Sequence, residues 1–246
     1  MILSTTILVL VAVLFSAFLR GMAGFGFALA AVPIVSVVLS PLEAVTLSIL
    51  LQIVVGVRDS FTLYSEIHRP SFLRLCIGAI VGIPVGVLGL TALSPDAARI
   101  MIAVVVLAGL IILLRYKPST SAPNGPLAVV AGVVAGAFTG LAAMPGPPAV
   151  AYFLGTSLPP KQTHASLLLF FFVVVLLAMP GLYLKGALTQ SILIITAMSI
   201  PSMALGTWLG TAAFKRLNST QYRNIAIGVM ALAAILAGWR GIAAYI

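Results

Sequence analysis

The sequence predicts an all-α protein that crosses a membrane several times and is built from two inverted repeats. Of its 246 residues, 62% are hydrophobic and only 7% are charged, whereas roughly a quarter of the residues of a soluble domain are charged. Apolar runs recur along the whole chain, and roughly 20 apolar residues in a helix cross a bilayer. This composition disfavours a soluble helical domain.

Eight apolar runs define the expected helical segments. They cover residues 2–19, 28–39, 72–93, 100–114, 127–143, 167–184, 191–214 and 225–239. Together with the shorter apolar stretches between them, these runs predict about 8–10 transmembrane segments. The first run follows no basic segment and no clear cleavage site, so we expect a retained helix rather than a signal peptide.

The chain divides into a first repeat at residues 1–117, a linker at 118–126 and a second repeat at 127–246. We expect the two repeats to form one membrane domain. In each, five segments follow the same order, and the first ends in a Gly/Pro-rich break. The fourth carries an Ile-Pro pair, and the fifth opens with a leucine followed six positions later by an arginine. These features are Ile83-Pro84 and Leu93–Arg99 in one repeat, and Ile200-Pro201 and Leu217–Arg223 in the other. They predict an internal repeat with a period near 120 residues.

Basic residues predict the orientation of the chain in the membrane. With the loop at 58–74 in the cytoplasm, ten of the thirteen basic residues fall inside: Arg20, Arg58, Arg69, Arg74, Arg115, Lys117, Lys161, Lys215, Arg216 and Arg223. Only Arg99, Lys185 and Arg240 fall outside, as the positive-inside rule favours. Both termini are then extracytoplasmic, and five segments per repeat make the repeats inverted. The net charge of +9 therefore reflects topology and does not indicate nucleic-acid binding.

Two breaks interrupt the apolar segments at matching places, Gly21–Phe27 and Gly140–Pro148. Broken helices persist in a bilayer only where protein or a polar cavity surrounds their free backbone groups. A matched pair of such breaks points to the substrate site of a transporter. The apolar stretches that follow, 27–39 and 149–158, are short enough to be half-helices. We therefore expect two broken hairpins, re-entrant or spanning, that meet near the midplane.

The chemistry expected at the breaks is anion binding by the backbone. A half-helix presents free N–H groups and a partial positive charge at its N-terminus. Glycine lets a ligand approach the backbone, and Pro147-Pro148 suits a first helical turn. Kinks that serve packing alone are the alternative. The predicted substrate-binding residues of the breaks are Gly21, Gly24, Phe25, Gly26, Met144, Pro145, Gly146 and Pro147.

Three polar side chains complete the predicted site. Gln52 lies among apolar residues and so needs a hydrogen-bond partner. Arg20 immediately precedes the first break and either anchors the helix at the cytoplasmic surface or faces the substrate path. His164 either binds an anion or relays a proton, or is an interfacial side chain bonded to a loop.

Glycines also recur at four-residue spacing in three segments: Gly78, Gly82 and Gly86; Gly132, Gly136 and Gly140; Gly206 and Gly210. Such small-residue ridges let helices approach closely, so we interpret them as packing surfaces. None of the four acids lies in mid-helix by this interpretation, which disfavours a membrane-embedded carboxylate relay. The residues offer no nucleotide motif, no clustered metal ligands and no paired titratable groups, so we expect no metal, no cofactor and no enzymatic activity.

These motifs resemble the TauE/SafE family of sulfite-exporter-like permeases over nearly the whole chain. The resemblance rests on four stretches: Gly21–Phe27 with Pro33, Gly136–Val150, Gly82–Gly86 and Leu93–Arg99. Members typically carry a Gly-Gly-Gly-like break in each half, whereas this chain has Gly24-Phe25-Gly26 and Met144–Pro148. It also has His164-Ala165 where many of the subgroup have Arg-Ala. The resemblance implies transport of small sulfur-containing anions, such as sulfite, sulfoacetate or other organosulfonates, across the bacterial inner membrane.

Taken together, the residues and the resemblance predict a secondary permease for a small anion that works by alternating access around the two hairpins. An anion channel with the same midplane site is the alternative. We expect the substrate and the lipid bilayer as partners, with proton coupling through His164, and no nucleic acid. The oligomeric state stays open, with a homodimer among the options.

Overall fold

The structure is a computed structural model of the whole chain, and it describes residues 3–23, 26–115, 121–214, 235 and 239. Several residues singled out above lie outside these ranges: Gly24, Phe25, Lys117, Lys215, Arg216, Leu217, Arg223 and Arg240, with most of the apolar run 225–239. The regular secondary structure of the described residues is helical and contains no named strand.

The helices of the described residues confirm an all-α, multi-pass membrane protein. They are α1 (Leu3–Ala23), α2 (Phe27–Val35), α3 (Pro41–Leu63), the 3₁₀ turn η1 (Tyr64–Glu66), α4 (Arg69–Ala92), α5 (Pro95–Arg115), α6 (Gly125–Ala142), α7 (Gly146–Leu154), α8 (Pro160–Leu184) and α9 (Gln190–Phe214). Six of them, α1, α4, α5, α6, α8 and α9, are long and apolar enough to cross a bilayer. The remaining long helix, α3, is apolar over Pro41–Val57.

Helices α2 and α7 are short, as the sequence predicts for half-helices. Each has nine residues, and nine helical residues rise about 14 Å, half of a hydrocarbon core of roughly 30 Å. Their bounds differ from the expected ones. Helix α7 starts at Gly146 rather than at residue 149, because Pro147 and Pro148 lie in its first turn, where proline is tolerated.

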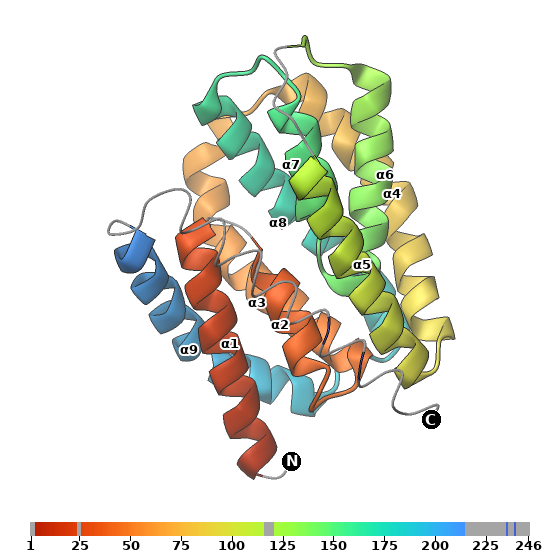
Figure 1. Cartoon of the computed structure of the whole chain (residues 1–246), viewed down its shortest axis with the longest axis vertical. Coiled ribbons are helices and arrows are strands. Elements are labelled where there is room, and N and C mark those ends of the chain that lie inside the picture. Colours follow the sequence, from red (N-terminus) through yellow and green to blue (C-terminus); the bar gives the residue numbers. More distant parts are fainter. Residues whose placement is uncertain (1–2, 24–25, 116–120, 215–234, 236–238, 240–246) are drawn as a thin grey trace.

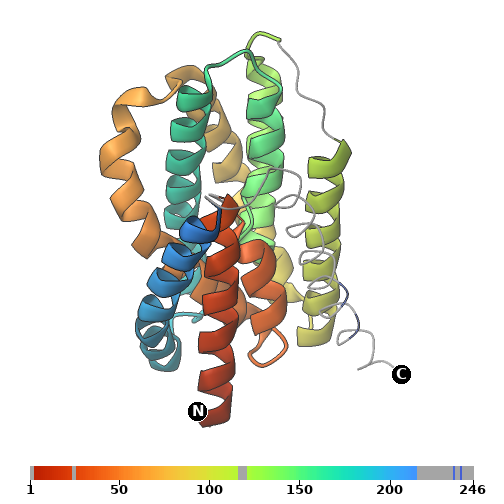
Figure 2. The ribbon, with the colours of Figure 1, turned by 60° about the vertical axis from the view of Figure 1, so that its left-hand side comes forward.

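Each half-helix forms a hairpin with the longer helix before it. In Figures 1 and 2, α1 rises from the lower end of the molecule and α2 returns downward. Helix α6 descends from the upper end, and α7 returns upward (Figure 1). The end of α1, the start of α2 and the turn between α6 and α7 therefore lie inside the molecule, away from its two ends.

Glycine ridges join the hairpins to other helices. A Cβ atom added at Gly82 of α4 would overlap the backbone of Val133 in α6, and one added at Gly136 would lie 2.7 Å from the Ala79 carbonyl oxygen. Helices α1 and α9 meet in the same way, with Gly210 against Phe18. Figure 1 shows both pairs side by side. The glycines are packing surfaces, as predicted, since a side chain here would separate the helices.

Two of the glycine contacts bear on the predicted repeat. Gly86 lies against Gly140, and Gly210 lies against Gly21. Pro84 precedes Gly86 by two residues, whereas Pro201 precedes Gly210 by nine. The two Ile-Pro pairs therefore lie at different distances from these two glycines, and the internal repeat stays a prediction.

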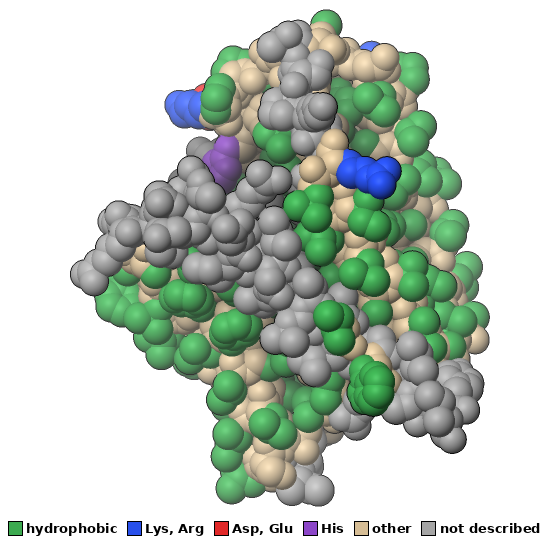
Figure 3. Space-filling view, viewed as in Figure 1, with side chains coloured by type: hydrophobic (Ala, Val, Ile, Leu, Met, Phe, Trp, Pro, Cys, Tyr) green, Lys and Arg blue, Asp and Glu red, His purple; other side chains and the backbone are tan. Residues whose placement is uncertain are grey.

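Large apolar side chains cover the outside of the molecule, as Figure 3 shows for one face. On α4 alone, Ile80, Val81, Val85 and Leu88 are each more than half exposed. Contiguous apolar surface of this kind is unfavourable in water and suits contact with lipid. Charged residues gather at helix ends instead. Glu43 illustrates this, since its carboxylate accepts from Ser40 N at 2.9 Å in the capping box of α3.

Candidate functional site

Described residues of both helix breaks line one small cavity. Its lining residues are Gly26, Phe27, Ala28 and Leu29 from the first hairpin, Ala143, Met144, Pro145, Gly146 and Pro147 from the second, Gln52 of α3 and Phe171 of α8. All of these side chains are uncharged. The cavity measures about 20 Å³, which is enough for about one water molecule. Six of the predicted site residues thus come together: Gly26, Gln52, Met144, Pro145, Gly146 and Pro147.

The lining residues include four pairs with one constant separation. Gly26 and Pro145, Phe27 and Gly146, Ala28 and Pro147, and Gln52 and Phe171 are each 119 positions apart. The first and last residues of α2 and α7 are separated by the same 119 positions. Positions that correspond by this separation therefore line the same cavity from both hairpins.

The first break ends in a left-handed glycine. Gly26 is the N-cap of α2, with φ 91° and ψ 11°, a backbone conformation that glycine adopts without the strain that a Cβ atom brings. It provides no side-chain cap. The Gly26 carbonyl accepts from Leu29 N at 3.1 Å, while the N–H groups of Phe27 and Ala28 belong to the first turn, which has no intrahelical acceptors. The start of α2 therefore offers backbone donors and a positive helix end at the cavity.

The second break uses a left-handed alanine instead. Ala143, with φ 56° and ψ 28°, ends α6, and it is the one non-glycine residue with positive φ among the described residues. Its N–H bonds Thr139 O at 2.8 Å, and Met144 N bonds Phe138 O at 3.2 Å. This pattern closes the end of a helix but usually employs glycine, because a Cβ atom here costs about 1–2 kcal/mol.

Gln52 holds this strained alanine from across the cavity. Its Nε2 donates to Ala143 O at 3.2 Å and to Ser48 O at 3.1 Å, which confirms that it needs a partner. Rotating the amide by half a turn would place Oε1 against two carbonyl oxygens, so the hydrogen bonds determine the orientation of the amide. With its Nε2 on both carbonyl oxygens, Gln52 braces the second break.

The second half-helix presents few donors. Pro147 and Pro148 have no N–H, so Gly146 is the one residue among the first three of α7 that supplies a backbone donor. Helix α5 seats this end of α7, because a Cβ atom at Gly109 would lie 2.8 Å from Pro147 Cγ. The positive end of the α7 dipole still faces the cavity.

The other predicted site residues lie elsewhere or outside the described ranges. Gly21 packs against α9, where Thr211 Oγ1 donates to its carbonyl oxygen at 3.3 Å. Arg20 is half-buried in the last turn of α1 and does not line the cavity. His164 is exposed in the first turn of α8, two turns before Phe171. Gly24 and Phe25 are not described.

Sequence reasoning missed two lining residues that it had the means to find. Phe171 follows Gln52 by the repeat separation, and Ala143 follows Gly24 by the same 119 positions. Aligning the two breaks residue by residue would have marked both. Helix periodicity alone does not distinguish Phe171 from its neighbours, because Phe171 lies inside a continuous apolar run.

A polar chain at the far end of α7 was also missed. His68 Nδ1 and Ser71 Oγ lie 2.9 Å apart, and Ser71 Oγ lies 2.8 Å from the hydroxyl of Tyr152 in α7. His68 N also donates to Ser166 Oγ at 2.9 Å. Burial, and secondly the Arg74 guanidinium, lower the pKa of His68 from its ordinary value of 6.5. These contacts tie α4, α7 and α8 together.

Two oppositely directed half-helices at a cavity with uncharged lining residues, within a multi-pass helical protein, are typical of membrane transporters. Comparison with known families agrees. The sequence matches the sulfite exporter TauE/SafE family over residues 8–237, so the chain belongs to that family, whose members are transporters and not enzymes.

A curated relative of this chain is the "Probable sulfite/organosulfonate exporter TauE" of Cupriavidus necator. The two are 26% identical over 158 residues, which are 63% of this chain and 62% of that protein. The match thus spans less than two thirds of the relative. No solved structure matches the chain.

Proposed function

We propose that this protein is a secondary transporter of a small sulfur oxyanion or organosulfonate, such as sulfite or sulfoacetate. The observation that carries the proposal is the meeting of both helix breaks at one cavity lined by uncharged residues. Two positive helix ends and the backbone donors of α2 attract an anion there without a buried charged side chain. The relative's printed name supports the sulfur-containing class.

The small size of the cavity supports alternating access. A space of about 20 Å³ holds about one water molecule, and sulfite has four heavy atoms. Substrate therefore enters only after lining residues move apart. A permanently open anion pore would need a wider continuous path, so the channel alternative receives less support from this cavity.

We also propose that residues 1–117 and 127–246 are inverted repeats that move against each other. Support comes from the 119-position separation of four cavity-lining pairs. Support also comes from the helix contacts between the two repeats. Helix α1 of the first repeat packs on α9 of the second, and α4 of the first packs on α6 of the second. Helices α1 and α6 run in opposite directions in Figure 2, as inversion requires.

The proposed location is the bacterial inner membrane, with extracytoplasmic termini. The starts of α4 and α8 and the end of α5 lie toward the upper end of Figure 1, and they carry Arg69, Arg74, Lys161 and Arg115. The start of α5 and the end of α8, with Arg99 and Lys185, lie toward the lower end. The upper end is then cytoplasmic by the positive-inside rule. We retain proton coupling through His164 as a proposal; a His164→Gln variant whose transport keeps the pH dependence of the wild type would overturn it.

The test is sulfite transport by the full chain in proteoliposomes. We expect saturable uptake and counterflow in the wild type, and loss of both in Gly146→Leu, because the side chain fills the cavity at the first turn of α7. Gly181→Ala is the control, since an added Cβ atom there makes an ordinary 3.4 Å contact with Val87. Unimpaired transport by Gly146→Leu would remove the site assignment. Non-saturating flux without counterflow would establish the channel instead.

A further inference from the structure

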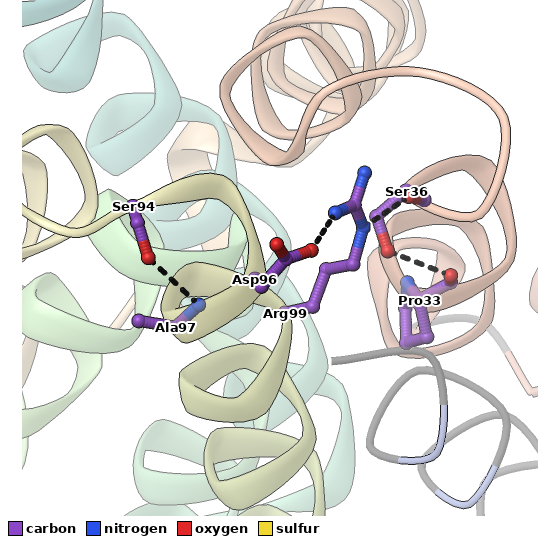
Figure 4. Close-up of polar contacts among 6 residues, drawn as sticks. All are labelled: Pro33, Ser36, Ser94, Asp96, Ala97 and Arg99. Carbon is purple, nitrogen blue, oxygen red and sulfur yellow. Dashed lines mark hydrogen bonds and ion pairs between the residues drawn. The ribbon is translucent and has the colours of Figure 1, made fainter. Parts of the chain in front are cut away.

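Helix α2 is held at the end farthest from the cavity by a partly buried arginine. Arg99, in the first turns of α5, donates through Nε to the Ser36 carbonyl oxygen at 2.9 Å (Figure 4). Its Nη1 contacts Asp96 Oδ1 at 2.6 Å. The Arg99 side chain is 13% exposed, so the two contacts determine its position.

Ser36 is the C-cap of α2, which makes this contact a capping interaction. The last carbonyls of a helix have no intrahelical donor and carry a partial negative charge. The Arg99 guanidinium supplies both a donor and a positive charge there. Ser36 Oγ also donates to Pro33 O at 2.8 Å, so the side chain and the carbonyl oxygen of this one residue serve the same helix end. Asp96 in turn orients the guanidinium.

A short helix transmits the position of one end to the other. Helix α2 has nine residues and Gly26 to Leu29, at its start, line the cavity. It rises about 14 Å as one hydrogen-bonded unit. Displacing its N-terminus as a rigid body therefore displaces Ser36 and breaks the contact with Arg99.

The same helix that carries Arg99 also touches the second half-helix. Ten residues further along α5, Gly109 accommodates Pro147, with an added Cβ atom only 2.8 Å from Pro147 Cγ. Through Arg99, helix α5 thus contacts the outer end of α2. Through Gly109, it contacts the end of α7 that faces the cavity. It connects the two sides of the cavity independently of the hairpin turns.

We propose that Arg99, oriented by Asp96, is a positioning residue of the transporter that fixes the N-terminus of α2 at the anion site. The transport experiment that tests this inference rests on the proposed function, whereas the experiment on the placement of α2 does not. Arg99 lies at the outer end of α2 and does not touch the cavity. It acts through the helix, by keeping the backbone donors of Phe27 and Ala28 in a binding-competent place.

The first experiment measures KM and maximal rate for sulfite in proteoliposomes. Removing the cap lowers the fraction of protein with α2 in place, and apparent affinity falls by that fraction. For Arg99→Gln we expect KM to rise about tenfold, which corresponds to one tenth of the molecules being competent, with a smaller change in maximal rate. Arg99→Lys restores charge without the planar fork and is expected to recover part of the affinity. Glu66→Gln is the matched control, because it breaks an ion pair with Lys161 whose side chains are 76% and 40% exposed.

The second experiment follows α2 directly and needs no transport. In a Cys76→Ala background, Ala28→Cys places a thiol in the first turn of α2, at the cavity. We expect its reaction with a small polar thiol reagent to accelerate when Arg99→Gln is added. Ala149→Cys, buried in α7, is the control and is expected to react at an unchanged rate.

The outcomes separate this inference from the proposed function. Faster labelling at position 28 without sulfite transport by the wild type would support the role of Arg99 and remove sulfite as substrate. Unchanged KM and unchanged labelling in Arg99→Gln would overturn the inference. This holds even if the variant has a lower thermal midpoint, because Arg99 would then stabilise the fold without positioning α2.

Discussion

The two helix breaks meet at the same cavity but are built differently. The first ends in glycine, Gly26, and opens a helix whose first residues carry N–H groups. The second combines a left-handed alanine, Ala143, with Pro145, Pro147 and Pro148, and is braced by Gln52. Proline removes donors and restricts the backbone. If an anion binds as proposed, the first break offers it more backbone donors, while the second offers a rigid wall and a helix dipole.

The largest effect is expected where the brace of the second break is removed. Gln52→Leu leaves the Ala143 carbonyl without its side-chain donor, and a buried group that loses its partner costs about 1–3 kcal/mol. We expect sulfite transport to fall at least about tenfold, since 1.4 kcal/mol is a factor of ten. Phe171→Leu, at the corresponding position of the second half, is the control and should retain more activity. Equal losses in both variants would show that the cavity needs volume and not the hydrogen bond.

The two left-handed residues predict stability changes of opposite sign. Gly26→Ala adds a Cβ atom at φ 91° and should lower the unfolding free energy by about 1–2 kcal/mol. Ala143→Gly removes the corresponding strain and should raise stability by up to about 1 kcal/mol. Thermal unfolding midpoints in detergent measure both. A lower midpoint for Ala143→Gly would mean that chain entropy outweighs the strain at this position.

The far ends of the half-helices extend the comparison. Helix α2 is capped by Arg99, a charged donor, whereas α7 is tied by the neutral bond between Tyr152 and Ser71. A neutral hydrogen bond contributes about 1 kcal/mol and a charged one more. Tyr152→Phe should therefore lower the thermal midpoint and raise KM by less than Arg99→Gln does. A larger effect from Tyr152→Phe would reverse this order and identify α7 as the more loosely held helix.

The smallest effect is expected from the histidine beside this contact. Burial and Arg74 lower the pKa of His68 below 6.5, so the unfolded chain takes up the proton at a higher pH than the folded chain. Stability linked to His68 is therefore complete above about pH 6.5 and decreases as the pH falls below it. His68→Gln should flatten the dependence of the thermal midpoint on pH in this range. An unchanged slope would exclude His68 as its source.

Local physics within the sequence determined much of this protein. Scarce charge and long apolar runs require a membrane, because such a surface is unfavourable in water. Gly/Pro breaks at matching places predicted the two half-helices, since broken backbone must be enclosed. Gln52 among apolar neighbours predicted a hydrogen-bond partner, because a buried amide without one is destabilising. Spaced glycines predicted close helix packing, since they lack a side chain that would hold neighbours apart.

Tertiary structure alone decided which partners these features meet. Periodicity does not reveal that Gln52 reaches Ala143, 91 positions away, or that Arg99 caps α2 through Ser36. Nor does it show that Gly21 packs on α9 and not at the cavity. Each depends on how helices distant in the chain approach one another. A sequence specifies local backbone preference residue by residue, whereas a site formed between hairpins exists only once both have packed.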